Sequence, residues 1–177
     1  MRSETLAQLM VPEEATYQIE YDTTRAPGTG IAPGTEQRTA WTFRSKAPKG
    51  RRLRRLREDV PARGGLRRAP VILTGFDVPL SPLNQAAAGR EFTFTTARAN
   101  GYAGVPDVAG ASVAVSYGDG TTWQNAEARL GDGGRHAVTV RHPALARTNG
   151  FVTLRVEVWD ADGNRTTQTI KRAYGLR

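Results

Sequence analysis

The stretch Gly150-Phe-Val-Thr-Leu-Arg-Val-Glu-Val-Trp-Asp-Ala-Asp-Gly-Asn-Arg-Thr-Thr-Gln-Thr-Ile-Lys-Arg-Ala-Tyr174 decides the fold of this chain. Its first half alternates between apolar and polar residues, and the apolar positions are Val152, Leu154, Val156 and Val158. Because successive side chains of a strand point to opposite faces, this spacing predicts a strand with one buried side. Asp160-Ala-Asp-Gly-Asn164 then supplies the turn-tolerant residues of a hairpin loop. The stretch therefore predicts strand, turn and strand.

Short strand signals of the same kind recur from residue 71 onward. They cover 71–76, 91–98, 111–117, 121–130, 135–141, 151–159 and 165–174. Gly-, Asn- and Asp-rich turns separate them, which is typical of an immunoglobulin- or fibronectin-like β-sandwich. The expected core is Ile72, Phe76, Phe92, Phe94, Val113, Val115, Tyr117, Trp123, Val138, Val140, Val152, Leu154, Val156, Val158 and Ile170. We expect an all-β fold with this sandwich over residues 70–177.

A short β element is predicted in residues 1–45. Residues 16–22 and 38–45 both alternate, so they are expected to pair as an antiparallel ribbon. A two-stranded ribbon is marginally stable alone in water. The ribbon must therefore pack on the C-terminal domain, or else it is the end of a truncated upstream domain.

The positive charge of the chain is concentrated between these two parts. Residues 44–68 contain eleven Lys and Arg and two acids, so this segment has a net charge of +9. The whole chain has a net charge of +8, so the remaining residues together carry about −1. Repulsion between like charges and the scarcity of apolar residues oppose compaction. Residues 46–69 are therefore predicted to be a basic, flexible linker.

Composition excludes several classes of site and location. The chain has no Cys, which excludes disulfides, thiolate metal ligands and a cysteine nucleophile. No apolar run approaches the roughly 18 residues of a membrane span. Residues 1–14 carry three Glu and no continuous apolar core, so we expect no signal peptide in this chain.

Three groups of residues carry a family resemblance. One is Val113-Ala-Val-Ser-Tyr-Gly-Asp-Gly-Thr-Thr-Trp123. Another is Phe151-Val-Thr-Leu-Arg-Val-Glu-Val-Trp-Asp-Ala-Asp-Gly-Asn164, followed by the ending Thr169-Ile-Lys-Arg-Ala-Tyr-Gly-Leu-Arg177. The third is Thr16-Tyr-Gln-Ile-Glu-Tyr-Asp-Thr-Thr-Arg25 with Thr39-Ala-Trp-Thr-Phe43. Together they resemble the C-terminal, non-catalytic region of large secreted subtilisin-like serine peptidases of actinobacteria.

The resemblance implies an extracellular accessory domain that stabilises a peptidase or helps it contact macromolecular substrate. Its expected partners are the missing upstream peptidase domain or that enzyme's protein substrate. The segment 46–69 departs from the family pattern, in which the corresponding connection is shorter and less basic. The chain would then be a truncated gene product, a fragment or a free-standing accessory domain.

No catalytic site is expected. A subtilisin-like triad needs a Ser nucleophile, a His base and an orienting Asp, and no Gly-Thr-Ser nucleophile loop occurs here. Ser112 and Ser116 share the strand face opposite the core, and His136 and His142 are expected at the surface. The sequence therefore predicts a protein that is not an enzyme and needs no cofactor.

The hairpin loop also offers oxygen ligands. Asp160, Asp162 and Asn164 alternate as ligands of calcium loops do. The twelfth position, counted from Asp160, is Lys171, where an EF-hand loop requires an acid. Ordinary turn chemistry is the favoured interpretation, and a weak calcium site is the alternative.

Two binding alternatives remain open. A polyanion such as nucleic acid could be bound through phosphate contacts of Arg51, Arg52, Arg54, Arg55 and Arg57. The segment lacks the aromatic residues that stack on bases, which disfavours nucleic acid. Trp159 lies on the strand face opposite the valines, so it is the candidate contact of a carbohydrate- or cell-wall-binding module.

Overall fold

The computed structural model describes residues 14–26, 32–45, 69, 71–98, 108–132 and 135–177. The strands are β1 (Ala15–Thr24), β2 (Glu36–Ser45), β3 (Thr74–Asp77), β4 (Gln85–Ala86), β5 (Glu91–Arg98), β6 (Val108–Ser116), β7 (Gln124–Leu130), β8 (His136–Arg141), β9 (Phe151–Asp160) and β10 (Arg165–Leu176). A short 3-10 turn, η2 (Leu145–Arg147), precedes β9. The all-β prediction is confirmed.

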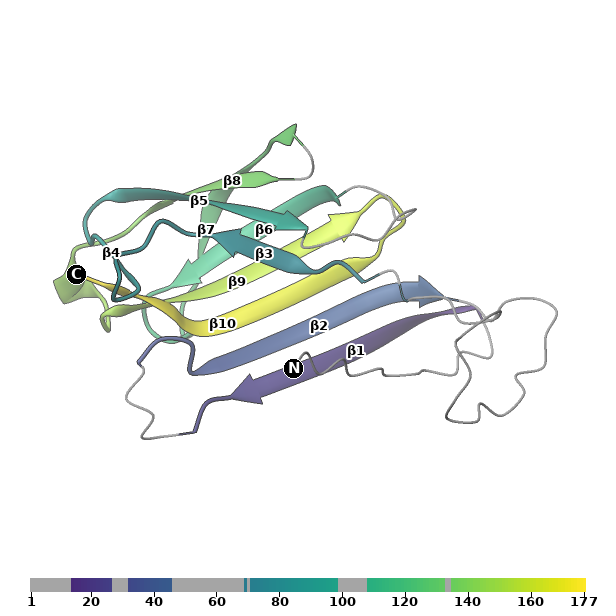
Figure 1. Cartoon of the computed structure of the whole chain (residues 1–177), viewed down its shortest axis with the longest axis horizontal. Coiled ribbons are helices and arrows are strands. Elements are labelled where there is room, and N and C mark those ends of the chain that lie inside the picture. The colour runs from purple at the N-terminus through teal and green to yellow at the C-terminus, as the bar shows by residue number, and fades with distance from the viewer. Residues whose placement is uncertain (1–13, 27–31, 46–68, 70, 99–107, 133–134) are drawn as a thin grey trace.

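The strands form two layers that share one edge. Their order is β1-β2-β10-β9-β6-β7-β8-β5-β3, and β4 pairs with β10 beside this path (Figure 1). Along this order every pair of neighbours is antiparallel, and only β4 is parallel to its partner. Because β7 pairs with both β6 and β8, the chain folds over at β7 and lays β8, β5 and β3 across the face of β6, β9 and β10. This is a β-sandwich, as the strand spacing predicts.

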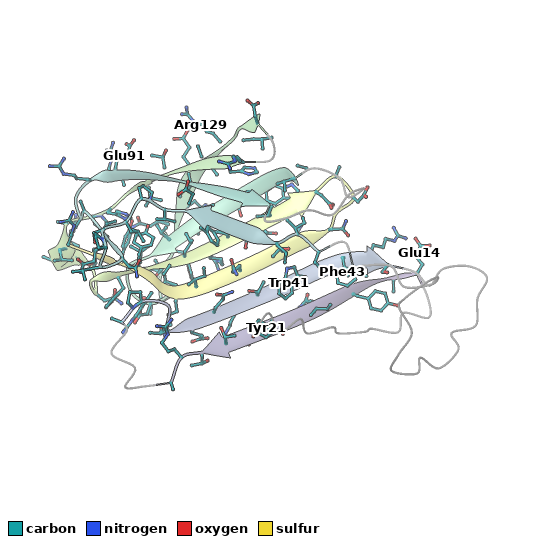
Figure 2. The ribbon with its side chains drawn as sticks, in the orientation of Figure 1. Glu14, Tyr21, Trp41, Phe43, Glu91 and Arg129 are labelled. Atoms are coloured by element: carbon teal, nitrogen blue, oxygen red, sulfur yellow. The ribbon has the colours of Figure 1, made fainter. Side chains whose placement is uncertain are left out.

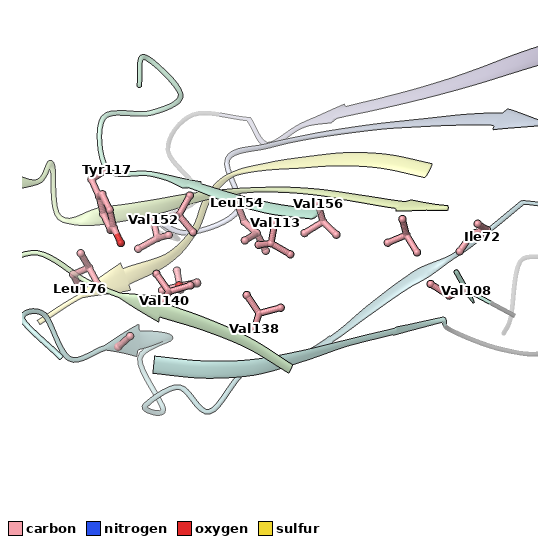
Figure 3. Close-up of a cluster of buried hydrophobic side chains, with 14 residues drawn as sticks. Ile72, Val108, Val113, Tyr117, Val138, Val140, Val152, Leu154, Val156 and Leu176 are labelled. Carbon is pink, nitrogen blue, oxygen red and sulfur yellow. The ribbon is translucent and has the colours of Figure 1, made fainter. Parts of the chain in front are cut away.

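The core lies between the layers and is built mainly from valines (Figure 3). Its buried members are Ile72, Ala86, Val108, Val113, Val115, Tyr117, Val138, Val140, Val152, Leu154, Val156, Val158, Tyr174 and Leu176. Ten of these belong to the predicted core. Phe76 packs against the cluster, while Trp123 and Ile170 are only half-buried. The side chains of Phe92 and Phe94 lie outside the described residues.

Residues 71–73 were expected to belong to a strand, but β3 begins only at Thr74. The carbonyl of Ile72 accepts hydrogen bonds from Trp41 Nε1 at 3.1 Å and from Thr166 Oγ1 at 2.6 Å. The Ile72 carbonyl is therefore bonded to the side chains of Trp41 and Thr166 instead of to the backbone of a neighbouring strand.

The N-terminal strands form the expected ribbon, and that ribbon is part of the larger sheet. β1 and β2 pair over all ten residues of each strand. β2 also pairs with β10, which places Trp41 opposite Thr166 and Thr39 opposite Gln168. The ribbon thus extends one layer of the sandwich by two strands. Residues 46–68, most of the predicted basic linker, lie outside the described residues.

A bulge bends β10 between Ile170 and Tyr174. Arg172 occupies it with a φ of 52°, in the left-handed region that ordinary residues rarely adopt. Its guanidinium donates to both carboxylate oxygens of Asp119, at 3.0 Å and 2.7 Å, and lies 5.0 Å from the ring centre of Phe151. The turn between β6 and β7 is thereby fastened to the bulge.

Candidate functional site

The broadest candidate surface is the side of the extended layer that points away from the sandwich core. We call it the outer face and define it by two cross-strand rows. Sheet register gives one row as Gly110, Trp159, Arg165 and Thr42, and the other as Ser112, Glu157, Thr167 and Ala40. Both rows cross β6, β9, β10 and β2. Most of these side chains are small or hydroxylic, so the face has little relief apart from its Trp and its charged groups.

Trp159 lies on this face, on the side of β9 opposite the valines, as predicted. Its indole lies across Gly110 of β6, where a Cβ atom would stand 2.6 Å from Trp159 Cε2. Only glycine leaves room for the ring at that position. Trp159 is half-buried. The ring is therefore supported by a strand instead of projecting freely, which reduces the entropy it would lose on binding.

Charged residues flank the indole. Arg165 Nε lies 2.9 Å from Glu157 Oε1, and both side chains are partly exposed. Further along β9, the guanidinium of Arg155 lies 4.1 Å from the ring centre of Trp123. The outer face therefore carries one indole that rests on backbone, that of Trp159, while the indole of Trp123 is in contact with a cation, Arg155.

The loop between β9 and β10 is organised by its own hydrogen bonds. Asp160 is 3% exposed, and its Oδ1 accepts from the backbone N–H groups of Asp162 and Asn164 at 3.0 Å and 2.9 Å. Its Oδ2 accepts from Asn164 Nδ2 at 2.8 Å. Asn164 Oδ1 in turn accepts from the Arg44 N–H at 3.2 Å. The Asp160 carboxylate thus stabilises a turn through hydrogen bonds. A calcium ion would have to compete with these N–H donors for the carboxylate oxygens.

The prediction that both histidines are surface residues is wrong. His136 and His142 are each 2% exposed. His142 Nδ1 lies 3.1 Å from the Tyr117 hydroxyl, and its ring meets Tyr174 edge-on. Burial lowers the pKa of His142 to about 4 and raises that of Tyr117 to about 12. His136 and His142 share the parity of Val138 and Val140, so alternation marks their side of β8 as the buried one, and this signal identifies both histidines.

Ser116 is also more enclosed than its strand face suggests. It is 1% exposed, whereas Ser112 on the same face is exposed. Ser116 Oγ accepts from the N–H groups of Gly118 and Gly120, at 3.3 Å and 2.9 Å. Its hydroxyl therefore shapes the turn after β6.

A buried polar network that no sequence motif predicts joins the ribbon to the sandwich. We call it the polar seam; it comprises Thr39, Trp41, Thr74, Thr166, Gln168 and the Ile72 carbonyl. Gln168 Oε1 accepts from Thr74 Oγ1 at 2.7 Å, and Gln168 Nε2 donates to Thr39 Oγ1 at 3.2 Å. The only available signal was that Thr166 and Gln168 share the parity of Ile170, which is a predicted core position.

The remaining candidates are few within the part of the chain that the structure describes. Arg51, Arg52, Arg54, Arg55 and Arg57 all lie outside it. Among the described residues, no three His, Cys, Asp or Glu side chains are grouped so as to hold a metal ion. No helix there is long and apolar enough to cross a membrane. Comparisons with protein-family models, with curated proteins and with solved structures find no match to the chain.

Proposed function

We propose that this chain is a non-catalytic accessory β-sandwich that works by surface contact, as the tail of a secreted subtilisin-like peptidase would. Its partners in this proposal are a peptidase domain or the protein substrate of that enzyme, and its place of action is extracellular. The observation that carries the proposal is the outer face, which pairing of β2 with β10 widens beyond an ordinary sandwich layer.

The outer face is suited to contact with extended macromolecules. Small side chains such as Ala40 and Thr167 lie between charged ones such as Glu157 and Arg165. Polar groups at the surface can form hydrogen bonds with a peptide backbone without a deep pocket. The buried state of His136 and His142 further supports a role without hydrolysis, because a general base must reach its substrate.

The test is binding of fluorescein-labelled casein, followed by fluorescence anisotropy. The wild-type chain should bind, and the double variant Ala40→Arg/Thr167→Arg should bind at least tenfold more weakly because two long cations crowd the centre of the outer face. Leu83→Arg is the matched control, since Leu83 is 76% exposed and lies away from this face, in the loop between β3 and β4. Absence of wild-type binding, or an equal loss in both variants, would contradict the proposal.

Hydrolysis is checked on the same samples. Casein should stay intact, and a serine-directed fluorophosphonate probe should label no serine of the chain. Labelling of Ser112 or Ser116, located by peptide mapping, would show instead that the chain is a hydrolase.

The geometry of Trp159 favours carbohydrate or cell-wall binding as a second candidate function. A half-buried indole packed over the backbone of a neighbouring strand offers a fixed aromatic surface on which the apolar face of a sugar ring can stack. Retention on insoluble cell-wall polysaccharide should then be abolished by Trp159→Ala. Trp123→Ala, which removes the indole already in contact with Arg155, should leave retention unchanged. Equal retention of wild type and Trp159→Ala would rule out this candidate.

A further inference from the structure

The outer edge of the extended layer is a long strand with three large apolar residues on one side. β1 pairs with β2 and with no other strand among the described residues. The side of β1 that follows the sandwich interior carries Tyr17, Ile19 and Tyr21. Ile19 is 37% exposed and Tyr21 is 57% exposed. The strip continues onto β2, where Trp41 lies opposite Ile19 and Phe43 lies opposite Tyr17. Figure 2 shows Tyr21 on β1 and both Trp41 and Phe43 on β2.

This edge has few of the features that prevent strands from pairing. Protected edges are short, bulged, or interrupted by Pro or Lys. β1 has ten residues, contains no Pro or Lys, and pairs with β2 in an unbroken register. At every second residue of an edge strand, the N–H and C=O groups point away from the sheet and lack a strand partner. Only Glu20 and Asp22, on the opposite side of the strand, add charge.

The sequence of β1 is complementary to itself in one antiparallel register. When Ile19 faces Ile19 of a second copy, each Tyr17 faces a Tyr21, so all the apolar residues meet on one side. On the other side Glu20 faces Gln18, and Asp22 faces Thr16. Gln18 Nε2 already donates to Glu20 within the chain, so amide and carboxylate are known partners. No acid lies directly opposite another acid.

Neighbouring registers lose this match. Face alternation allows only shifts that keep odd residues opposite odd residues. A shift in one direction places Glu20 opposite Glu20 of the second copy, and a shift in the other places Glu14 opposite Asp22. Like charges directly opposite each other destabilise a strand pair. The charge pattern therefore selects the register centred on Ile19.

We propose that β1 pairs antiparallel with β1 of a second copy of this chain, centred on Ile19, and joins the two extended layers into one continuous sheet. The pairing is isologous, so it closes as a dimer with two-fold symmetry and does not propagate. It places the two outer faces side by side on one surface. The inference goes beyond the proposed function and does not depend on it, because it concerns the edge of the layer and not the ligand of its face.

Site-directed cross-linking of the full chain tests the register. Because the chain has no Cys, a single introduced Cys is unique. Ile19→Cys should form a covalent dimer under mild oxidation, seen on non-reducing gels, because the two Cys lie directly opposite. Tyr21→Cys should remain monomeric, since each Tyr21 faces Tyr17 and its counterpart lies four residues, or roughly 13 Å, further along. Leu130→Cys, with the same 57% exposure as Tyr21, controls for random collision.

Sedimentation velocity on chains without Cys provides a second, independent measurement. The wild type should shift from monomer to dimer with rising concentration, and Ile19→Lys should raise the dimer dissociation constant at least tenfold. Leu130→Lys should leave it unchanged. A wild type that stays monomeric throughout, or Cys variants that cross-link equally at positions 19, 21 and 130, would overturn the proposal.

Discussion

The sandwich core joins the two layers by burial of apolar side chains, whereas the polar seam joins the β1–β2 ribbon to the sandwich by hydrogen bonds. In the core, valines of β6, β8 and β9 are removed from water and need no particular orientation. In the seam, Gln168 is 8% exposed and must meet Thr39 and Thr74 with its amide correctly directed. The core therefore gives most of the stability. The seam fixes where the β1–β2 ribbon sits, because a buried polar group is costly if its partner is displaced.

This contrast predicts different responses to substitution. A core variant should weaken the whole sandwich, since one apolar cluster spans both layers. A seam variant should loosen the ribbon before the sandwich, because the seam contacts concentrate on β2, β10 and the start of β3.

Leu154→Ala should have the largest effect. Leu154 is 3% exposed in the middle of β9, so truncation removes buried apolar area and leaves a cavity. The expected loss in the free energy of unfolding is about 3 kcal/mol, measured by urea denaturation. Leu83→Ala, at a residue 76% exposed, should change it by less than about 0.5 kcal/mol. Equal effects of the two variants would show that the core assignment is wrong.

Acid should weaken the polar cluster at the edge of the core. His142 is held neutral in the folded protein, with a pKa near 4 in place of its ordinary 6.5. The unfolded chain therefore binds a proton at a pH where the folded chain does not, so stability falls as pH drops from about 6.5 toward 4. Between pH 7 and pH 5 the expected loss from this group is about 2 kcal/mol.

His142→Phe isolates that contribution. The substitution keeps an aromatic ring beside Tyr117 and Tyr174 but removes the titrating group. Urea denaturation of both proteins at pH 7 and pH 5 should show a much smaller pH dependence for the variant. If the variant loses as much stability as the wild type between these pH values, another group is responsible.

Gln168→Leu should loosen the seam. The variant leaves the hydroxyls of Thr39 and Thr74 without their amide partner, which should cost about 1–2 kcal/mol. Compared with the wild type, the variant should show a larger increase in hydrogen exchange at the amides of β1 and β2 than at those of β9. Uniform loss of protection in all three strands would mean that the seam does not act locally.

The triple variant Thr39→Val/Thr74→Val/Gln168→Leu serves as the matched control. It removes all three polar groups together, so no hydroxyl is left without a partner, and it should recover most of the stability lost by Gln168→Leu. Failure to recover would attribute the loss to packing and not to unpaired polar groups.

The sequence predicts the core better than the seam for a physical reason. Alternation from Val152 to Val158 marks one face of a strand whatever that face meets, so β9 and its burial follow directly. Whether Gln168 points to water or to Thr74 depends on where residues 72–74 cross β10, which involves a separation of 94 residues. Alternation places Gln168 on the same side of β10 as Ile170, but it does not identify the partner that Gln168 meets there.

The same limit applies to the candidate sites. The position of Trp159 opposite the valines followed from alternation, but its support by Gly110 comes from the pairing of β6 with β9. Alternation with Val138 and Val140 marks the side of β8 on which the histidines lie, but it does not indicate that His142 meets Tyr117, 25 residues away. The turn at Asp160 is predictable because every hydrogen bond that its side chain accepts comes from the next four residues.

The smallest expected effect concerns the ion pair that fastens the bulge of β10. Arg172 holds the pKa of Asp119 below its ordinary value, mainly through their direct hydrogen bonds. The resulting stability is present at neutral pH and is lost only as pH falls through that low pKa, below the range in which His142 titrates. Because the two side chains are 36% and 24% exposed, water screens the pair, and Asp119→Asn should cost no more than about 1 kcal/mol at pH 7.

Glu127→Gln is the appropriate comparison for Asp119→Asn. Glu127 pairs with Arg129 at the same 2.7 Å distance, but these side chains are 61% and 78% exposed and lie two residues apart on β7. This variant should leave the free energy of unfolding unchanged within error. A measurable loss of stability for Asp119→Asn alone would mean that the backbone position of the paired Arg matters more than the length of the ion pair. Arg172 occupies a left-handed backbone conformation, and Asp119 helps to hold it there. Equal results for the two variants would show that the bulge is maintained by the sheet pairing on either side of it.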